Sequence, residues 1–506
     1  MSQIPALIPT LLLLAALLSL LAGLKSQRAG YFLALMGAGA SFLVSVLGLV
    51  EVVSSGQAIR YAMGGWIPPI GIEFVLDHLA AYMTTLITFI GVVVFIYAPR
   101  SLHFESPGKA TFAYPSMALL IAGLAGMTLT GDVFNLYVFL EIAALAAYAL
   151  LAIGERGGPF ATLRYLLIGA AGGGFYLLGV GFLYFSAGTL NMADLSGLLP
   201  ELMENRAVMT AAALMVVGLA LKMALFPMHF WMPDVYHNAP TVAAGLIAPI
   251  MTKVSAYAII RLFLDVFPPG FFTETLPITA TIGWLSAAGI LYGSILAIAQ
   301  HDYRRMLAYS SVGQIAYVGL GIGLANPIGL IGGLLHIVNH ALMKGLLFLI
   351  GGAVRLRTGV TRIPDMKGLG RSMPWTMYAF VIGILGMVGI PPTAGFFSKF
   401  YLLLGAVEAG AWIWFAVIIV SSLLSAVYFF RVTEMIFRDP GEDPAETSRE
   451  EGGEKDETTP DQPQGDPPAS MFIPIAILAA GVILVGVFNF VIISALLERV
   501  VAPLGG

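Results

Sequence analysis

Four lysines stand inside long apolar runs of the sequence, where a charged side chain would lie in lipid: Lys222, Lys253, Lys344 and Lys399. A lysine at the bilayer centre costs roughly 2.5–3.5 kcal/mol or more, so such residues are rare and mostly functional. A lysine that snorkels from a helix end to the interface is the alternative. Because four lysines repeat the pattern, we interpret them as functional amines inside a membrane.

Glu141 is an acid deep in another apolar run, FNLYVFLEIAALAAYALL. A carboxylate alone in hydrocarbon would take up a proton, because burial disfavours its charged form. Beside a lysine it can stay ionised and keep the amine charged, and separating the two would favour a neutral amine and release a proton. Such a pair could move protons across a membrane. A purely structural ion pair between helices is the alternative.

His336, His340 and Lys344 follow one another at i, i+4 and i+8, so they share one face of a helix. Histidine titrates near neutrality, and such a row suits a proton relay that Lys399 ends on one side. Two histidines four residues apart could also bind a metal. We expect none, because no carboxylate or cysteine accompanies them and Lys344 would repel a cation. Six further residues could hydrogen-bond water along the path or simply pack between helices: Tyr137, Tyr148, Tyr257, Ser310, Ser311 and Gln314.

Two of the apolar runs are interrupted by proline, which removes a backbone donor and breaks a helix. Pro227 follows Lys222 in GLALKMALFPMHFWMPDVYHNAPT, and Pro391 and Pro392 precede Lys399 in GIPPTAGFFSKF. Inside a membrane, the freed backbone groups must be satisfied by protein or water. Both breaks are therefore expected to line a buried polar cavity.

Polar residues near the ends of the predicted segments are candidates for entrances. His229, Asp234 and His237 follow the first break, and we expect them to form its cytoplasmic mouth or to cap the broken ends. Asp77 and His78 could form an outer entrance or mark the membrane interface.

The composition predicts an all-α polytopic membrane protein, because 58% of the 506 residues are hydrophobic and only 11% are charged. There is no cysteine, which excludes disulfides and thiolate metal sites, and no phosphate-binding loop, haem or flavin motif stands out, so no cofactor is expected. No basic soluble domain is present, so we expect no nucleic-acid partner. Fourteen transmembrane segments are predicted, at about 5–24, 31–53, 73–98, 112–130, 133–154, 160–186, 207–236 (broken), 241–266, 277–300, 305–324, 327–353, 374–406 (broken), 410–437 and 470–493.

The two broken segments, the seventh and the twelfth, lie five segments apart. A five-helix unit has an odd number of crossings, so a second copy enters the membrane from the opposite side and forms an inverted repeat. Lys222 and Lys399 are then expected at roughly equivalent places. The resulting regions are three N-terminal helices, the first repeat, the second repeat, an acidic loop and the last helix, at 1–111, 112–267, 268–438, 439–468 and 469–506.

The distribution of basic residues predicts the orientation. With the N-terminus outside, the cytoplasmic loops carry 17 of the 25 bases and the outer loops carry four, and the remaining four are the lysines inside apolar segments. The positive-inside rule therefore places both termini on the outer side. Residues 439–468 hold 11 of the 29 acids, and their proline- and glycine-rich composition predicts a disordered cytoplasmic loop.

These motifs resemble the antiporter-like subunit family, which includes the A and D subunits of Mrp-type Na⁺/H⁺ antiporters and the proton-pumping membrane subunits of complex I and membrane-bound hydrogenases. The resemblance covers about residues 5–437 and is specific at the motifs quoted above, at HDYRRMLAYSSVGQIAYV and at HIVNHALMKGLLFLIGG. It implies that Glu141 and Lys222 form a switchable pair, and that Lys253 and His336 or His340 continue a proton path to Lys399. The fifth predicted helix is most similar to that of the Mrp D subunits, and the chain lacks the long C-terminal extension of the Mrp A subunits.

The resemblance implies a proton-translocating component of a multisubunit Na⁺/H⁺ antiporter in a bacterial or archaeal cell membrane. Its partners would be other membrane subunits, protons, Na⁺ and the lipid bilayer, with no catalytic chemistry in this chain. The alternative is a proton-pumping component of a complex I-type NADH:quinone oxidoreductase or of a membrane-bound hydrogenase. A scaffold that conducts nothing is disfavoured, because four buried lysines are a stability cost that a scaffold need not carry.

Overall fold

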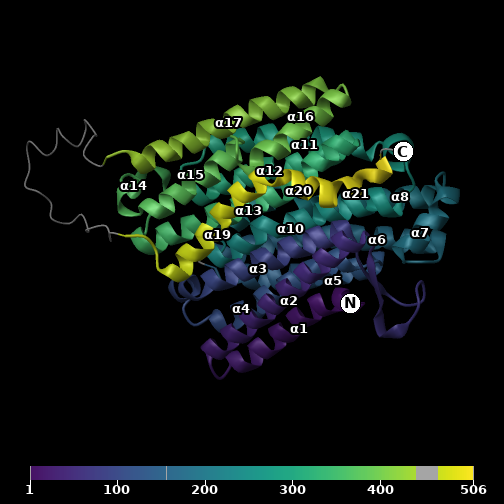
Figure 1. Ribbon diagram of the computed structural model, residues 1–506, viewed down its shortest axis with the longest axis horizontal. Helices are drawn as coiled ribbons and strands as arrows, with labels where there is room; N and C mark the ends of the chain where they lie inside the picture. Colours follow the sequence, from purple (N-terminus) through teal and green to yellow (C-terminus); the bar gives the residue numbers. More distant parts are fainter. Residues whose placement is uncertain (1, 155–156, 440–464, 505–506) are drawn as a thin grey trace, which may run out of the picture.

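The computed structural model describes residues 2–154, 157–439 and 465–504. It is a bundle of long α-helices whose axes run in one general direction (Figure 1). Within these described ranges, 13 helices are long and apolar enough to cross a membrane. One further crossing consists of two shorter helices, α15 and α16, on either side of a break. The predicted all-α membrane fold is confirmed, whereas most of the predicted acidic loop lies outside the described residues.

The helices of the bundle agree with the predicted segments to within a few residues at most ends. Their bounds are α1 (Ile4–Gly23), α2 (Gln27–Ser55), α3 (His78–Glu105), α4 (Ala110–Leu129), α5 (Val133–Ala152), α6 (Gly158–Ala187), α8 (Arg206–Met223), α9 (Trp231–Asn238), α10 (Thr241–Arg261), α11 (Ile278–Ile298), α12 (Tyr303–Leu324), α13 (Pro327–Thr358), α15 (Pro374–Val388), α16 (Ala394–Glu408), α17 (Trp412–Phe437) and α19 (Ala469–Val487).

Shorter elements connect these helices at both ends of the bundle. They are β1 (Ile59–Ala62), η1 (Met63–Gly65), β2 (Glu73–Leu76), α7 (Met192–Leu198), η2 (Leu199–Leu202), η3 (Leu262–Val266), η4 (Phe271–Thr275), η5 (Ile363–Asp365), α14 (Leu369–Ser372), α20 (Asn489–Ile492), η6 (Ile493–Leu497), α21 (Glu498–Val501) and η7 (Ala502–Leu504).

A β-hairpin between α2 and α3 is the main departure from the prediction. Strands β1 and β2 pair antiparallel, with Ile59 opposite Leu76, and the GGWIPPIG turn between them disfavours a helix. The third membrane helix therefore begins at residue 78 and not near 73, where the hydropathy signal starts. Asp77 fixes this start, because its Oδ1 accepts a hydrogen bond from the Ala80 amide at 2.8 Å.

The helices α4–α10 and α11–α17 form two units with matching contacts. In the first unit α4 packs against α5, α5 against α6, and α6 against α8; in the second α11 packs against α12, α12 against α13, and α13 against α16. Each unit contains one broken segment. This correspondence supports the predicted inverted repeat, while the domain boundaries remain a prediction.

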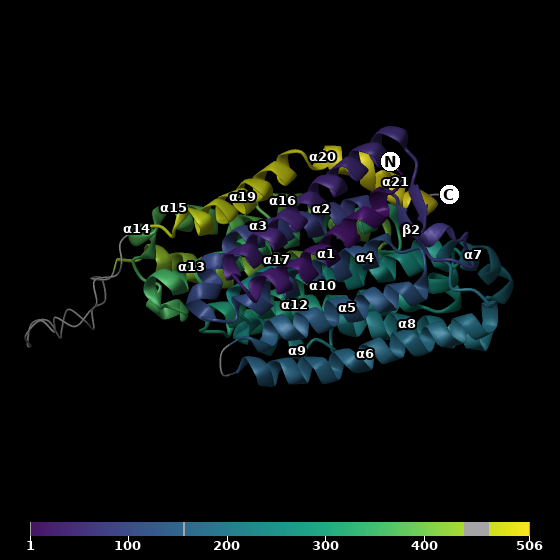
Figure 2. The ribbon, with the colours of Figure 1, turned by 90° about the horizontal axis from the view of Figure 1, so that it is seen from below.

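Helices α10, α12 and α13 form the centre of the bundle. They are almost wholly buried, whereas α2, α6 and α17 leave most of their surface on the outside. Figure 1 shows the three central helices between α1 and α2 on one side and α16 and α17 on the other. Figure 2 shows α6 and α8 along one edge. Any charged residue on α12 or α13 near mid-membrane must therefore be satisfied inside the protein.

Both breaks start with a residue in the left-handed backbone region. Helix α8 ends at Met223 because Ala224 has φ 61°, three residues before Pro227, and α15 ends at Val388 because Gly389 has φ 90°. Lys222 thus precedes its break, whereas Lys399 follows its break on α16. The expectation of equivalent places holds for the broken segments but is wrong for the position of each lysine within them.

Both termini lie toward the same end of the bundle, where α7 and the hairpin also lie (Figures 1 and 2). An even number of crossings requires this arrangement. The last helix turns at Phe488 and continues through α20 and a π-helical turn to α21. Which end faces outward remains the prediction that the basic loops make.

Candidate functional site

Lys222 and Glu141 form an ion pair between α8 and α5. The Nζ–Oε1 distance is 3.5 Å, and the Lys222 side chain is 3% exposed. At this length the contact is an ion pair without a good hydrogen bond. The Glu141 side chain is 27% exposed, so it lies closer to the surface of the helix bundle than its position in an apolar run suggested.

The glycines of α6 make room for this pair. A Cβ atom on Gly173 would come within 2.4 Å of Glu141 Oε1, and one on Gly169 within 2.2 Å of the Tyr148 hydroxyl and 3.5 Å of Lys222 Nζ. The GAAGGGF stretch of α6 therefore does more than allow close helix packing. It holds the surface against which the carboxylate and the amine rest.

Aromatic side chains surround the pair on the side of α10. The ring of Tyr165 stacks on Trp231 with centroids 4.1 Å apart and meets the edge of Tyr148 at 4.9 Å. The indole Nε1 of Trp231 donates at 3.2 Å to the carbonyl of Leu221, in the last turn of α8, which also accepts from the Ala224 amide at 3.1 Å. Tyr165 comes from α6, so no residue near Glu141 or Lys222 in the sequence marks it, and Trp231 lies in the broken segment that contains Lys222 but was not singled out there.

Lys253 lies at the centre of α10 and is 1% exposed. Its Nζ donates to the carbonyl of Ala248 at 2.5 Å. Among the described residues no carboxylate forms an ion pair with Lys253.

The predicted row on α13 is present and completely buried, with His336, His340 and Lys344 each 0% exposed. The two imidazole rings lie 5.9 Å apart at 25°. His336 is held at both nitrogens, by Ser398 Oγ at 2.9 Å and by Gln314 Oε1 at 3.1 Å. Both nitrogens of His340 are buried without a hydrogen-bond partner in the described part of the chain.

Lys344 ends the row on α13 and is bound by α12. Its Nζ donates to the Leu307 carbonyl at 2.8 Å and to Ser310 Oγ at 2.9 Å. Tyr428 of α17 lies within hydrogen-bond distance of the same serine hydroxyl, at 3.1 Å. The sequence predicts that Ser310 either hydrogen-bonds water or packs between helices. In the structure its hydroxyl oxygen accepts a hydrogen bond from Lys344.

Lys399 lies at the second break. Its Nζ donates to the carbonyls of Met387 and Val388 at 2.9 and 3.0 Å, which are the carbonyls that the end of α15 leaves without helical partners. The amine also lies 5.2 Å from the ring centre of Tyr317, which in turn lies 5.1 Å from the ring of His336. Lys399 therefore joins the row through Tyr317 and through Ser398, its neighbour in the sequence.

Several buried polar atoms along this line lack a hydrogen-bond partner in the described chain. They are Tyr148 Oη, Lys222 Nζ, Tyr236 Oη, Asn339 Oδ1 and both ring nitrogens of His340. Buried polar groups in proteins are almost always hydrogen-bonded, and ordered water is the usual partner where no protein group reaches them. The arrangement therefore suits a proton path in which water connects the titratable side chains.

The three predicted entrance residues do not converge. His229 lies buried in the first break with its ring against Phe226 and Tyr292. Asp234 forms ion pairs at the surface, with Arg164 at 2.7 Å and with Arg305 at 3.9 Å. The three side chains therefore lie in different surroundings, and their role as a cytoplasmic mouth or as caps of the broken ends stays a prediction. Of the three, His237 lines a pocket described below.

His237 lines a pocket of about 250 Å³ at the end of the bundle predicted to be cytoplasmic. Its Nδ1 lies 3.1 Å from Asp302 Oδ1, at the start of α12. Burial alone would raise the pKa of Asp302, but hydrogen bonds from His237 and the Arg305 amide hold it below its usual value. The carboxylate is therefore ionised at neutral pH and ties α9 to the second unit.

A buried ion pair forms another wall of this inner pocket. Arg304 Nη2 donates to Glu105 Oε1 at 3.0 Å, and Glu105 Oε2 accepts from the Thr241 amide at 2.6 Å. The two charged side chains are 8% and 4% exposed. Sequence reasoning counted Arg304 only as a loop base, because its partner lies 199 residues away.

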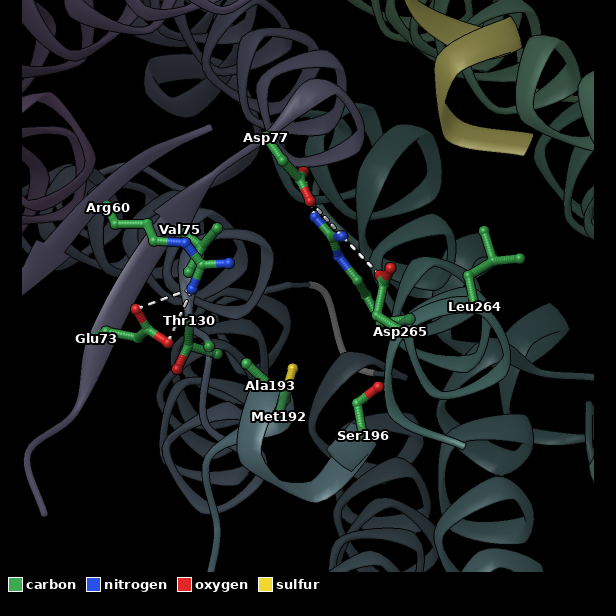
Figure 3. A pocket seen from close by; sticks show the side chains of 12 residues that line it. Arg60, Glu73, Val75, Asp77, Thr130, Met192, Ala193, Ser196, Leu264 and Asp265 are labelled. Atoms are coloured by element: carbon green, nitrogen blue, oxygen red, sulfur yellow. Dashed lines mark hydrogen bonds and ion pairs between the residues drawn. The ribbon is translucent and has the colours of Figure 1, made fainter. Parts of the chain in front are cut away.

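A second polar pocket, of about 340 Å³, lies at the opposite end of the bundle (Figure 3). Arg60 and Glu73 of the hairpin form one wall, and Asp77 and Asp265 lie on the other side with Arg261 between them. Arg261 Nη2 lies 2.5 Å from Asp77 Oδ1. Asp77 thus caps α3 and pairs with α10, so it contributes to the outer pocket as well as marking an interface.

Comparisons with known proteins place the chain among membrane complexes. A family model described as "NADH:quinone oxidoreductase/Mrp antiporter, TM" matches residues 130–425. The chain is 48% identical over 457 residues to the N subunit of NADH-quinone oxidoreductase from Desulforudis audaxviator, and the match covers 89% of each chain. It is 35% identical over 367 residues to the D subunit of the Na(+)/H(+) antiporter from Alkalihalophilus pseudofirmus, and this match covers 72% of this chain and 73% of the relative.

The fold is also similar to a chain in the solved structure of the membrane-bound sulfane sulfur reductase, an archaeal respiratory membrane complex. The two superpose with a TM-score of 0.88 at 28% identity, and the alignment covers 99% of this chain and 98% of that one. The similarity therefore extends over the entire helix bundle, including both breaks.

Proposed function

The chain belongs to the NADH:quinone oxidoreductase/Mrp antiporter family, and we propose that it carries protons across the membrane along its buried amines and imidazoles. The observation that carries the proposal is the set of four lysines, each at most 5% exposed, on helices of a membrane bundle. A buried lysine without a fixed acid exchanges its proton readily, because burial disfavours the charged amine.

Protons enter near Lys222 and Lys253 in the first unit. They pass across the bundle through His340, with His336 beside it, to Lys344, and leave by Lys399. Each step transfers one proton from a protonated group to a neutral neighbour, directly or through water. The carboxylate of Glu141 controls the first step, since moving it toward or away from Lys222 changes how firmly that amine holds its proton.

Other membrane subunits are the partners we propose. Phe134, Val138, Glu141 and Leu145 share one face of α5, and the three apolar members are 38–63% exposed. A carboxylate on such a face would be costly against lipid alone. A neighbouring protein that covers this face would shield Glu141 and could move it, which would couple events in the partner to this chain.

Two driving reactions are compatible with this proton path. The 35% identity to a protein named for Na⁺/H⁺ antiport supports the first, in which Na⁺ movement through the complex drives or follows the proton. The 48% identity to a component of NADH-quinone oxidoreductase supports the second, in which electron transfer in partner subunits drives the protons. The higher identity and coverage favour the redox-driven complex over the antiporter that the sequence motifs alone suggested.

The experiment that distinguishes the two driving reactions uses the intact complex. The complex is purified and its subunits are identified by mass spectrometry. The complex is reconstituted into vesicles of a cell membrane lipid extract, and internal pH is followed after adding either a Na⁺ gradient or an electron donor and quinone. We expect acidification or alkalinisation with one driving force only. No proton movement with either would contradict the proposal.

Lys222→Ala tests the role of this chain within the complex. We expect proton movement to fall to the background rate while the complex still assembles, because the amine that Glu141 controls is gone. Arg206→Ala is the matched control, since it removes an exposed base from the other end of the same helix. Wild-type proton movement in Lys222→Ala would show that the path does not run through this chain.

A further inference from the structure

A third polar pocket, of about 310 Å³, lies between α2, α3 and α4, away from the proton path. Its basic lining consists of Arg28 at the start of α2 and of Arg100 and His103 near the end of α3. All three belong to loops and helix ends on the side that the basic residues predict to be cytoplasmic. The pocket is therefore at the level of the lipid headgroups of the inner leaflet.

The positive charge of this pocket is not matched by an acid. Among the described residues, Arg28, Arg100 and His103 form no ion pair, in contrast to the arginines of the other two pockets. The only acid between residues 99 and 114 is Glu105, which is turned toward Arg304 and Thr241 in the inner pocket. Two exposed guanidinium groups around one hollow are thus available to an anion.

The floor of the pocket adds a hydroxyl without a hydrogen-bond partner in the described chain. Tyr114 lines the pocket and is only 5% exposed, and its ring packs against Tyr31 with centroids 5.3 Å apart. The first residues of α2 and α4 also line it, so two helix N-termini direct their free amides to this end. Guanidinium, hydroxyl and amide donors together suit the oxygens of a phosphate.

Exposed phenylalanines lie next to lining residues in the chain, at the same ends of α2, α3 and α4. Phe32 follows Tyr31, Phe104 follows His103, and Phe112 lies in the first turn of α4, and these side chains are 57%, 49% and 58% exposed. A free phosphate would gain nothing from them, whereas the acyl chains of a lipid would lie along these apolar surfaces. We propose that this pocket binds the phosphate headgroup of an anionic phospholipid of the inner leaflet, with its chains against these phenylalanines.

The test uses the intact complex and native mass spectrometry. The complex is depleted of lipid, incubated with phosphatidylglycerol or phosphatidylcholine, and this chain is released in the gas phase with the lipid it retains. We expect the wild-type chain to retain phosphatidylglycerol and Arg28→Gln/Arg100→Gln to retain roughly tenfold less. The reason is that each basic side chain near a membrane surface attracts anionic lipid, and this variant lacks two of them. Arg28→Lys/Arg100→Lys keeps both charges and should lose only a few-fold.

Arg362→Gln/Arg371→Gln is the matched control, because it removes two exposed arginines at the same end of the bundle outside this pocket. It should retain phosphatidylglycerol like the wild type. Equal retention by the wild type and Arg28→Gln/Arg100→Gln, or equal retention of phosphatidylcholine, would overturn the proposal. If the glutamine variant does not assemble, thermal stabilisation of the wild-type complex decides: phosphatidylglycerol should stabilise it and inorganic phosphate should not, and equal stabilisation by phosphate would overturn the lipid assignment.

Discussion

Lys222 in the first five-helix unit and Lys399 in the second both lie beside a helix break, but their surroundings differ. Lys222 faces a carboxylate, Glu141, at 3.5 Å from another helix. Lys399 faces two backbone carbonyls, at 2.9 and 3.0 Å, that belong to its own broken segment. The first amine is held by a charge on a side chain that can move, and the second by dipoles that are fixed in the fold.

This difference assigns different tasks to the two units. A partner that can approach or retreat changes how tightly an amine holds its proton, whereas fixed carbonyls hold that affinity constant. We infer that the first unit controls when a proton is released and that the second unit accepts and passes it. The row from Lys253 to Lys344 lies between them and, within the described residues, contains no acid that would trap a charge.

Among the variants that test this comparison, Glu141→Gln should have the largest effect on the rate of proton movement. The amide keeps the shape of the side chain but removes the charge, so Lys222 would resemble the carbonyl-bound Lys399. We expect the rate of proton movement by the reconstituted complex to fall by roughly 100-fold, the scale on which a positioned proton-transfer group acts. Glu408→Gln, at the exposed end of α16, is the control and should leave the rate unchanged. A small effect of Glu141→Gln would mean that the pair is structural.

His340→Gln should have the next largest effect on the rate of proton movement. It tests whether His340 or His336 carries the proton. Both ring nitrogens of His340 lack a hydrogen-bond partner in the described chain, whereas His336 is held by Ser398 and Gln314. We expect the rate to fall about tenfold in His340→Gln and less in His336→Gln. The reverse order in the same vesicle assay would make His336 the carrier.

Gly173→Ala tests whether the position of the carboxylate matters as well as its charge. The added methyl group would lie 2.4 Å from Glu141 Oε1 and must displace it, while the backbone around it is undisturbed. We expect a loss of about threefold to tenfold in rate, because small displacements of a reacting group are costly. Gly174→Ala is the control, since its methyl group would meet nothing within 4 Å. Equal rates in both variants would remove the geometric argument.

Arg60→Gln should have the smallest effect. The ion pair of Arg60 with Glu73 lies at the rim of the outer pocket, with the arginine side chain 57% and the glutamate side chain 8% exposed. Without Arg60, the Glu73 carboxylate keeps a hydrogen bond from Asn191 Nδ2 at 2.9 Å. Exposed pairs contribute about 0–1 kcal/mol. We expect less than about a twofold change in proton movement and little change in thermal stability of the complex. A large loss of transport would show that the outer pocket carries protons itself.

The sequence was sufficient for the helix bundle, the breaks and the buried amines. Apolar runs interrupted by proline or lysine are strong local signals in a membrane protein, since every such break has to be satisfied inside the bundle. The row on α13 could be placed on one face from its spacing alone. These features depend on residues that are neighbours in the chain.

The parts that the sequence did not show depend on contacts between distant residues. The pairing of Glu105 with Arg304 spans 199 residues, and the partner of Lys344 comes from another helix. The hairpin was missed because hydropathy does not separate a short apolar strand from the start of a helix. The three predicted entrance residues have different neighbours, which depend on how the first break and α9 pack and not on the spacing in the sequence, so their shared role stays a prediction.

Lys344→Ala is the most direct test that protons pass through the buried row. Lys344 is 0% exposed, and within the described chain its amine donates hydrogen bonds to Leu307 and Ser310 and forms no ion pair, so its removal leaves no buried acid unpaired. Proton movement by the reconstituted complex should fall to the background rate while the amount of assembled complex is unchanged. Proton movement at the wild-type rate in an assembled Lys344→Ala complex would contradict the account.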